Sequence, residues 1–212
     1  NNTIEHHLTG KFRMSTLLKI QSSLFNGHGQ SSSLASRFAD QWVAQMPGGR
    51  VISRNLAEEP VPHLNLDRFQ AFTTAADQQT EEQRQVVAYS DALIEEIRNA
   101  DVIVLGVPMY NFNVPTMLQS YFDHIARAGI TFRYTENGPE GLLKGKKAYV
   151  FISRGGIYGE DHSQTQYLRQ ILGFIGITDV EFVHAEGLAM NDSQKAESLK
   201  AADSRIGELL EV

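Results

Sequence analysis

The sequence feature that most constrains the fold is an alternation of short apolar runs with amphipathic segments of helical period, repeated five times. The clearest apolar run is Val102-Ile103-Val104-Leu105, in which every position is apolar. A strand with this pattern is covered on both faces, as in the centre of a parallel sheet. The runs predict strands at residues 17–20, 50–56, 101–108, 147–153 and 180–183.

Apolar residues recur at helical spacing between these runs. Leu34, Phe38, Trp42 and Met46 mark the first such segment, Ser31-Ser32-Ser33 offer N-cap residues for it, and Pro47-Gly48-Gly49 ends it. Further helices are expected at residues 81–99, 115–125, 167–175 and 194–210. Residues 59–79 are less regular, and we expect a long surface excursion with some helix.

The alternation predicts a doubly wound parallel α/β sheet with helices on both faces. Right-handed crossovers leave few topologies, and five strands without a second βαβαβ half favour the flavodoxin-like order 2-1-3-4-5. Residues 14–212 are expected to form one domain of this kind. Residues 1–13 are polar and precede the first apolar run, so we interpret them as disordered leader or vector-derived residues.

The composition narrows the classes of function. The chain has no cysteine, which excludes thiol nucleophiles and Cys-ligated metals. Its net charge is -6 with scattered Lys and Arg, which disfavours a nucleic-acid surface. No apolar run approaches the roughly 20 residues that cross a bilayer, and no secretory signal is evident. We therefore expect a cytoplasmic protein with no metal site, no nucleic-acid partner and no membrane partner.

The first predicted strand leads into a loop that can receive an anion. The segment from Ser22 to Ser31 contains hydroxyls and the glycines Gly27 and Gly29, ahead of a helix N-terminus. Unpaired N–H groups and the helix dipole favour a dianion such as phosphate there. The segment has no Lys or Arg and matches no Walker motif, so an ordinary serine-capped loop is the alternative.

Two further loops are expected at the same edge, because ligands of such sheets bind where the strands end. The loop from Pro108 to Pro115 carries aromatic residues that can lie against a planar ring, or can simply cap the core. The loop from Ser153 to Gly159 has two adjacent glycines, which let its backbone approach a ligand or form a plain turn. Its Arg154 could bind an anion or form a surface salt bridge.

Four segments of the chain, residues 108–113, 127–142, 153–156 and 173–177, resemble the FMN-dependent NADH-azoreductases. The likeness runs from about Met14 to the C-terminus. It implies a flavodoxin-like homodimer with these cofactor-binding residues: Ser23, Gly29, Gln30 and Ser31 at the FMN phosphate, Pro108, Met109, Tyr110, Asn111 and Phe112 beside the isoalloxazine, and Ser153, Arg154, Gly155 and Gly156 at the pyrimidine edge. The family usually has serine at the position of Gly29, so one hydroxyl contact is missing. Phe132, Tyr134 and Phe174 are implied on the substrate side or from the partner subunit.

The resemblance also implies the reaction. FMN takes hydride from NADH, or from NADPH, through its N5 atom and passes it to quinones or azo compounds in ping-pong fashion, giving hydroquinones or amines. No catalytic side chain is assigned, because FMN carries the hydride. NADH is favoured because the chain has no basic cluster for a 2′-phosphate. The alternatives are a quinone reductase with incidental azo activity, a flavodoxin-type electron carrier and a non-catalytic module.

Overall fold

The computed structural model describes residues 15–211, so the predicted leader at residues 1–13 lies outside the described residues. Five parallel strands form the central sheet, in the order β2-β1-β3-β6-β7. Their bounds are Arg50–Asn55 for β2, Thr16–Gln21 for β1, Val102–Pro108 for β3, Lys147–Ser153 for β6 and Asp179–Ala185 for β7. The predicted order is confirmed, because β4 (Phe132–Thr135) and β5 (Gly138–Gly141) form a separate antiparallel hairpin.

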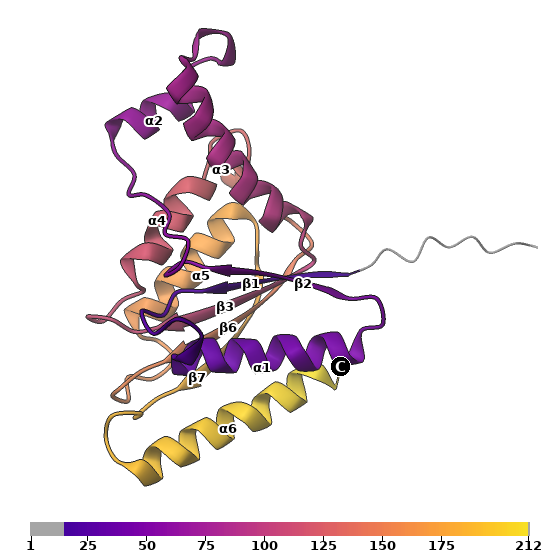
Figure 1. Cartoon of the computed structure of the whole chain (residues 1–212), viewed down its shortest axis with the longest axis vertical. Coiled ribbons are helices and arrows are strands. Elements are labelled where there is room, and N and C mark those ends of the chain that lie inside the picture. Colours follow the sequence, from indigo (N-terminus) through magenta and orange to yellow (C-terminus); the bar gives the residue numbers. More distant parts are fainter. Residues whose placement is uncertain (1–14, 212) are drawn as a thin grey trace, which may run out of the picture.

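Helices cover both faces of the sheet, as the alternation predicted (Figure 1). One face carries α1 (Gln30–Gln45) and α6 (Asp192–Leu210). The other carries α3 (Glu81–Asn99), α4 (Thr116–Ile125) and α5 (Ser163–Ile175). The irregular stretch contains one α-helix, α2 (Leu66–Thr73), and a short 3-10 helix, η2 (Ala76–Gln78). α2 packs on α3 beyond the end of the sheet.

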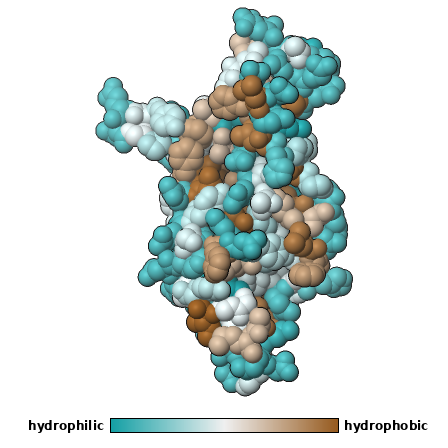
Figure 2. Space-filling view, turned by 90° about the vertical axis from the view of Figure 1, so that its left-hand side faces the viewer, coloured by the Kyte–Doolittle hydropathy of each residue, from teal (hydrophilic) through white to brown (hydrophobic). Residues whose placement is uncertain are grey.

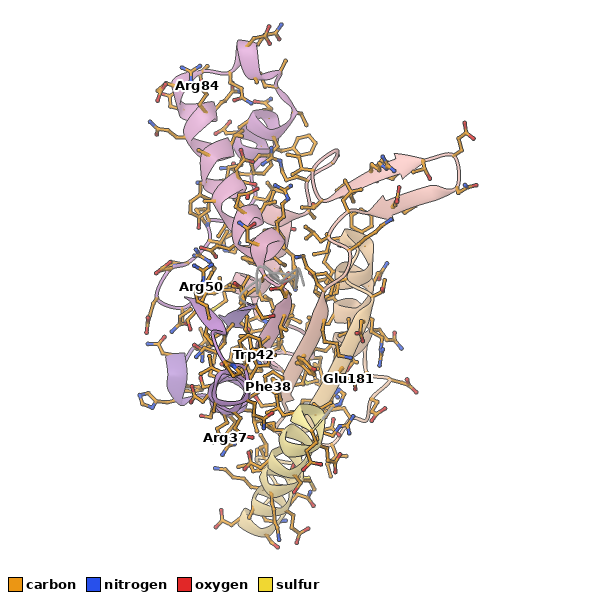
Figure 3. All side chains as sticks on the ribbon, turned by 90° about the vertical axis from the view of Figure 1, so that its right-hand side faces the viewer. Arg37, Phe38, Trp42, Arg50, Arg84 and Glu181 are labelled. Carbon is orange, nitrogen blue, oxygen red and sulfur yellow. The ribbon has the colours of Figure 1, made fainter. Side chains whose placement is uncertain are left out.

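The central strand β3 shows why its sequence is apolar throughout. Ile103 and Leu105 are buried in the core beneath α3, α4 and α5, whereas Val104 is buried in the core beneath α1 and α6. On the face covered by α1 and α6, Phe38 of α1 is fully buried and its ring centroid lies 4.4 Å from that of Tyr149 (Figure 3). Each large apolar side chain buried in this way contributes about 1.5–3 kcal/mol, so both faces stabilise the strand.

The hairpin β4–β5 projects from the side of the molecule and is held by the C-terminal end of α5 (Figure 3). Leu143 N donates to Ile175 O over 2.9 Å. A Cβ atom on Gly141 would lie 2.1 Å from Gly176 N, so only glycine permits this approach. Because α5 runs back from the carboxyl edge of the sheet, the hairpin is attached near the opposite, amino edge.

Candidate functional site

The three predicted loops meet at the carboxyl edge of the sheet, the edge that faces the viewer in Figure 2. They surround a cavity of about 310 Å³. Its lining includes these predicted residues: Ser23, Gly29, Gln30, Pro108, Met109, Tyr110, Ser153, Arg154 and Gly155. Asn111 lines an adjoining cavity of about 650 Å³ that shares Met109 and Tyr110. Ser31, Phe112 and Gly156 line neither of the two cavities.

Four residues that were not predicted as site residues also line the first cavity. Phe25 and His28 belong to the first loop, and Leu188 and Ala189 follow β7. Ala189 packs close to the third loop, because a Cβ on Gly155 would lie 3.3 Å from its Cβ. The signal for this fourth loop was available, since every loop that follows a parallel strand reaches the same edge.

The helix α1 presents its N-terminus to the first loop without a side-chain cap. The expected serine N-cap is wrong, because the N-cap residue is Gly29 and the serines lie inside the first turn. Among the described residues, nothing accepts a hydrogen bond from the backbone N–H groups of Gln30, Ser31 and Ser32. Three free donors at the positive end of a helix dipole favour an anion.

Hydroxyl groups surround these free amides. The Oγ atoms of Ser31 and Ser32 are buried with no hydrogen-bond partner in the described part of the chain. A Cβ on Gly29 would lie 2.1 Å from Ser23 Oγ, so the glycine leaves room for that hydroxyl beside the helix N-terminus. Free amides and unpartnered hydroxyls fit a phosphate that is bound by neutral donors.

The second loop is a tight two-residue turn with an unusual backbone. Tyr110 and Asn113 exchange two backbone hydrogen bonds of 3.0 and 3.1 Å, and the residues between them have φ of 48° at Asn111 and 66° at Phe112. Two consecutive left-handed residues define a type I′ turn. A left-handed conformation costs a non-glycine residue about 1–2 kcal/mol, and strain of this kind concentrates at functional sites.

Hydrogen bonds tie the second loop to its two neighbours. The hydroxyl of Tyr110 accepts from Leu24 N in the first loop over 3.1 Å. Met109 N donates to Ser153 O at the start of the third loop over 2.9 Å. The ring of Phe112 is 62% exposed and meets Tyr158 edge to face, with centroids 6.0 Å apart. The turn therefore holds an exposed aromatic ring beside the cavity.

The third loop is braced by Arg154, whose side chain is 0% exposed and forms an ion pair of 2.8 Å with Glu186. Arg154 is buried and Glu186 is half-buried, so the pair differs from the surface salt bridge considered above. Burial acts to raise the pKa of Glu186, but hydrogen bonds from Arg154 and from the N–H groups of Tyr158 and Gly159 outweigh it and leave the pKa lowered. The guanidinium is engaged within the protein.

The structure does not bring the predicted substrate-side residues to this cavity. Phe132 packs on Phe174 with ring centroids 4.3 Å apart, at the base of the hairpin. Phe132 also lines a different cavity, of about 250 Å³, together with Phe72 and Arg127. Tyr134 is 75% exposed on the hairpin. Within one chain, these three residues form a separate aromatic group near the amino edge of the sheet.

Two features are absent from residues 15–211. No three His, Asp or Glu side chains of this range are grouped so that they could hold a metal ion. No helix of the same range combines the length and the apolar character required to cross a membrane.

The chain matches a family model described as flavodoxin-like fold over residues 15–210. A protein of Cellvibrio japonicus named FMN-dependent NADH:quinone oxidoreductase is 54% identical over 185 residues, which cover 86% of this chain and 93% of the relative. A protein of Alcanivorax borkumensis with the same name is 50% identical, covering 90% of this chain and 97% of the relative.

Solved structures agree with these relatives. An azoreductase from Bacillus anthracis is 28% identical and superimposes with a TM-score of 0.85, covering 93% of this chain and 99% of that one. An FMN-dependent NADH-azoreductase from the same species, solved in complex with FMN, is 27% identical with a TM-score of 0.81, covering 93% of this chain and 100% of that one. The chain therefore belongs to the flavodoxin-like family that includes the FMN-dependent NADH:quinone oxidoreductases.

Proposed function

We propose that this chain is an FMN-dependent NADH:quinone oxidoreductase that also reduces azo compounds. The observation that carries the proposal is the set of amides and buried hydroxyls at the N-terminus of α1 that have no hydrogen-bond partner among residues 15–211. Relatives about half identical to the chain bear the name of this activity, and FMN is part of that name. The azo part rests on the structural neighbours, which are azoreductases.

The residues at the carboxyl edge fit FMN in three parts. Ser23 and the turn from Gly29 to Ser31 would hold the phosphate, the residues from Pro108 to Phe112 would lie beside the ring, and those from Ser153 to Gly156 would meet its pyrimidine edge. When bound, FMN supplies the two-electron chemistry that carries hydride from NADH to the acceptor. One NADH and one proton convert a quinone into a hydroquinone, and two of each convert an azo bond into two amines.

The protein's own contribution is positioning. The type I′ turn fixes the N–H groups of Asn111 and Phe112, which have no acceptor among residues 15–211. Amides fixed in this way stabilise negative charge without reorganisation during the reaction. The exposed rings of Phe112 and Tyr158 provide an aromatic surface for a flat substrate. All three nitrogen atoms of the Arg154 guanidinium donate hydrogen bonds within the protein, so we assign it no proton transfer.

We also infer that two copies of the chain form the working enzyme. Phe132, Tyr134 and Phe174 lie away from the cavity of their own chain, and the second copy would supply them to the substrate side. The exposed apolar side chains of Leu66 and Phe69 on α2 and of Tyr134 on the hairpin would be covered by the partner. Sedimentation of the FMN-loaded protein should give the mass of two chains, and a mass of one chain would contradict the inference.

The proposed electron donor, NADH, also suggests in which cellular compartment the protein works. A protein that draws on NADH is expected in the cytoplasm, where that dinucleotide is maintained. Fractionation of the source cells should place the chain with cytoplasmic markers, and recovery with secreted proteins would contradict this.

Anaerobic mixing of the FMN-loaded protein with NADH tests the proposal. The flavin absorption should bleach, and a later addition of benzoquinone or of an azo dye should restore it. Steady-state assays should give parallel double-reciprocal lines. A flavin that binds but is not bleached by NADH would favour the electron carrier. Rapid quinone turnover with negligible azo turnover would favour the quinone reductase with incidental azo activity.

A further inference from the structure

One buried glutamine, Gln164, forms hydrogen bonds to both the second and the third loop. Gln164 is the second residue of α5 and is 0% exposed. Its Nε2 atom donates to Pro108 O over 3.1 Å, and its Oε1 atom accepts from Arg154 Nε over 3.0 Å. The orientation of the amide is fixed by chemistry, because a carbonyl can only accept and a guanidinium can only donate.

Arg154, which donates to this amide, forms several other hydrogen bonds through its guanidinium. Its other side-chain donors reach Gly159 O, Glu186 Oε1 and Thr165 Oγ1 at 2.7 to 2.8 Å. Its backbone N donates to Ala185 O over 2.9 Å. Arg154 Nε donates to Gln164 Oε1. The side-chain amide of Gln164 is therefore positioned by a network of hydrogen bonds and not by a single one.

The carbonyl of Pro108 depends on Gln164 in turn. Pro108 is the last residue of β3 and is paired in register with Ser153 of β6. The β3–β6 ladder ends with the bond of 2.9 Å from Met109 N to Ser153 O, and the next amide along β6, that of Arg154, donates to Ala185 O of β7. Beyond these bonds the chain continues as loops on both sides, and Gln164 joins the two loops a second time through Pro108 O and Arg154 Nε. Its side chain does not line the cavity of about 310 Å³.

We propose that Gln164 is a positioning residue that sets the spacing of the two loops on which the flavin ring rests, and so controls how tightly FMN is held and how easily it is reduced. This proposal rests on the proposed function. The amides of Asn111 and of Gly155 belong to the two loops that Gln164 joins, and a change in their spacing alters the field at the ring even though Gln164 does not touch it.

Three variants distinguish the loss of the two hydrogen bonds of the Gln164 side chain from a general loss of packing. Gln164→Met keeps the volume and removes both hydrogen bonds. Gln164→Glu keeps the acceptor for Arg154 and removes the donor to Pro108. Gln166→Met is the matched control, because the side chain of this exposed residue of the same helix donates only to Asp161 O among the described residues.

The readouts are the Kd for FMN from fluorescence titration, the midpoint potential of bound FMN and the visible circular dichroism of the flavin. We expect the Kd of Gln164→Met to rise by about tenfold or more, since each lost bond leaves a buried group unpaired. The potential and the dichroism should shift with it, whereas Gln166→Met should match the wild type. Gln164→Glu should lie between the two, and it keeps the test open if Gln164→Met fails to fold.

Wild-type Kd, potential and dichroism in Gln164→Met would overturn the proposal, even if that variant unfolds at lower urea, because the role would then be structural only. A wild-type protein that binds FMN and is bleached by NADH, together with an unaffected Gln164→Met, refutes this inference alone. A wild-type protein that does not bind FMN refutes the proposed function and this inference with it.

Discussion

Replacing Phe112 with glycine should make the protein without cofactor more stable than replacing it with alanine. Phe112 has a φ of 66°, and a left-handed conformation costs a non-glycine residue about 1–2 kcal/mol. Glycine removes this cost but adds about 0.4–1 kcal/mol of unfolded-state entropy. At the midpoints of these two ranges the difference favours glycine by about 0.8 kcal/mol. Both variants lose the ring and its contact with Tyr158, so these losses cancel in the comparison.

The assay is urea unfolding of the two apoproteins under identical conditions. Phe112→Gly should have the larger free energy of unfolding, and its Tm should be about 2–4 °C higher for each kcal/mol gained. Asn111→Gly against Asn111→Ala should give the same sign, since Asn111 has a φ of 48°. Equal stability of Phe112→Gly and Phe112→Ala, or greater stability of the alanine variant, would refute the left-handed turn.

Three further predictions concern other parts of the molecule. Ser31→Ala should lower FMN affinity about tenfold while leaving the apoprotein as stable or more stable, because the hydroxyl is buried without a partner; an equal loss of FMN in Ser33→Ala would contradict this. Gly141→Ala should be strongly destabilised in urea by its clash with α5, whereas Gly207→Ala, with open space in α6, should gain about 0.5–1 kcal/mol; similar effects of the two would contradict the close approach. The pKa of Glu186 is lowered in the fold, so its stabilising contribution is complete above its ordinary value of 4.5 and is lost as the pH falls through the folded value. The stability gap between wild type and Glu186→Gln should therefore close in acid, and a gap that is independent of pH would contradict the ion pair.

The strand order could be predicted from the sequence because apolar runs and helical periods are local signals. The bounds of α3 and β6 agree with the predicted segments at residues 81–99 and 147–153. The N-cap of α1 could not be predicted in the same way, because several neighbouring residues can cap a helix and backbone geometry chooses between them. The N-cap is Gly29, where a Cβ would lie 2.1 Å from Ser23 Oγ, and this contact is not visible in the local sequence.

Contacts between distant segments account for the rest of what the sequence did not reveal. The environment of Arg154 depends on Glu186 and on Gln164, which reach it only after the sheet has formed. The turn at Asn111 and Phe112 lacks the glycine that usually signals a type I′ conformation. The loops were therefore predictable as a group, but the side chains that brace them were not.

Parallel titration of the apoprotein with FMN and with riboflavin measures what the predicted phosphate site contributes to binding, because the two ligands differ only by the phosphate. The free amides and hydroxyls at the start of α1 predict one FMN bound per chain and riboflavin bound at least about tenfold more weakly, a difference of about 1.4 kcal/mol. Equal affinity for the two ligands, or no binding of FMN, would contradict the account.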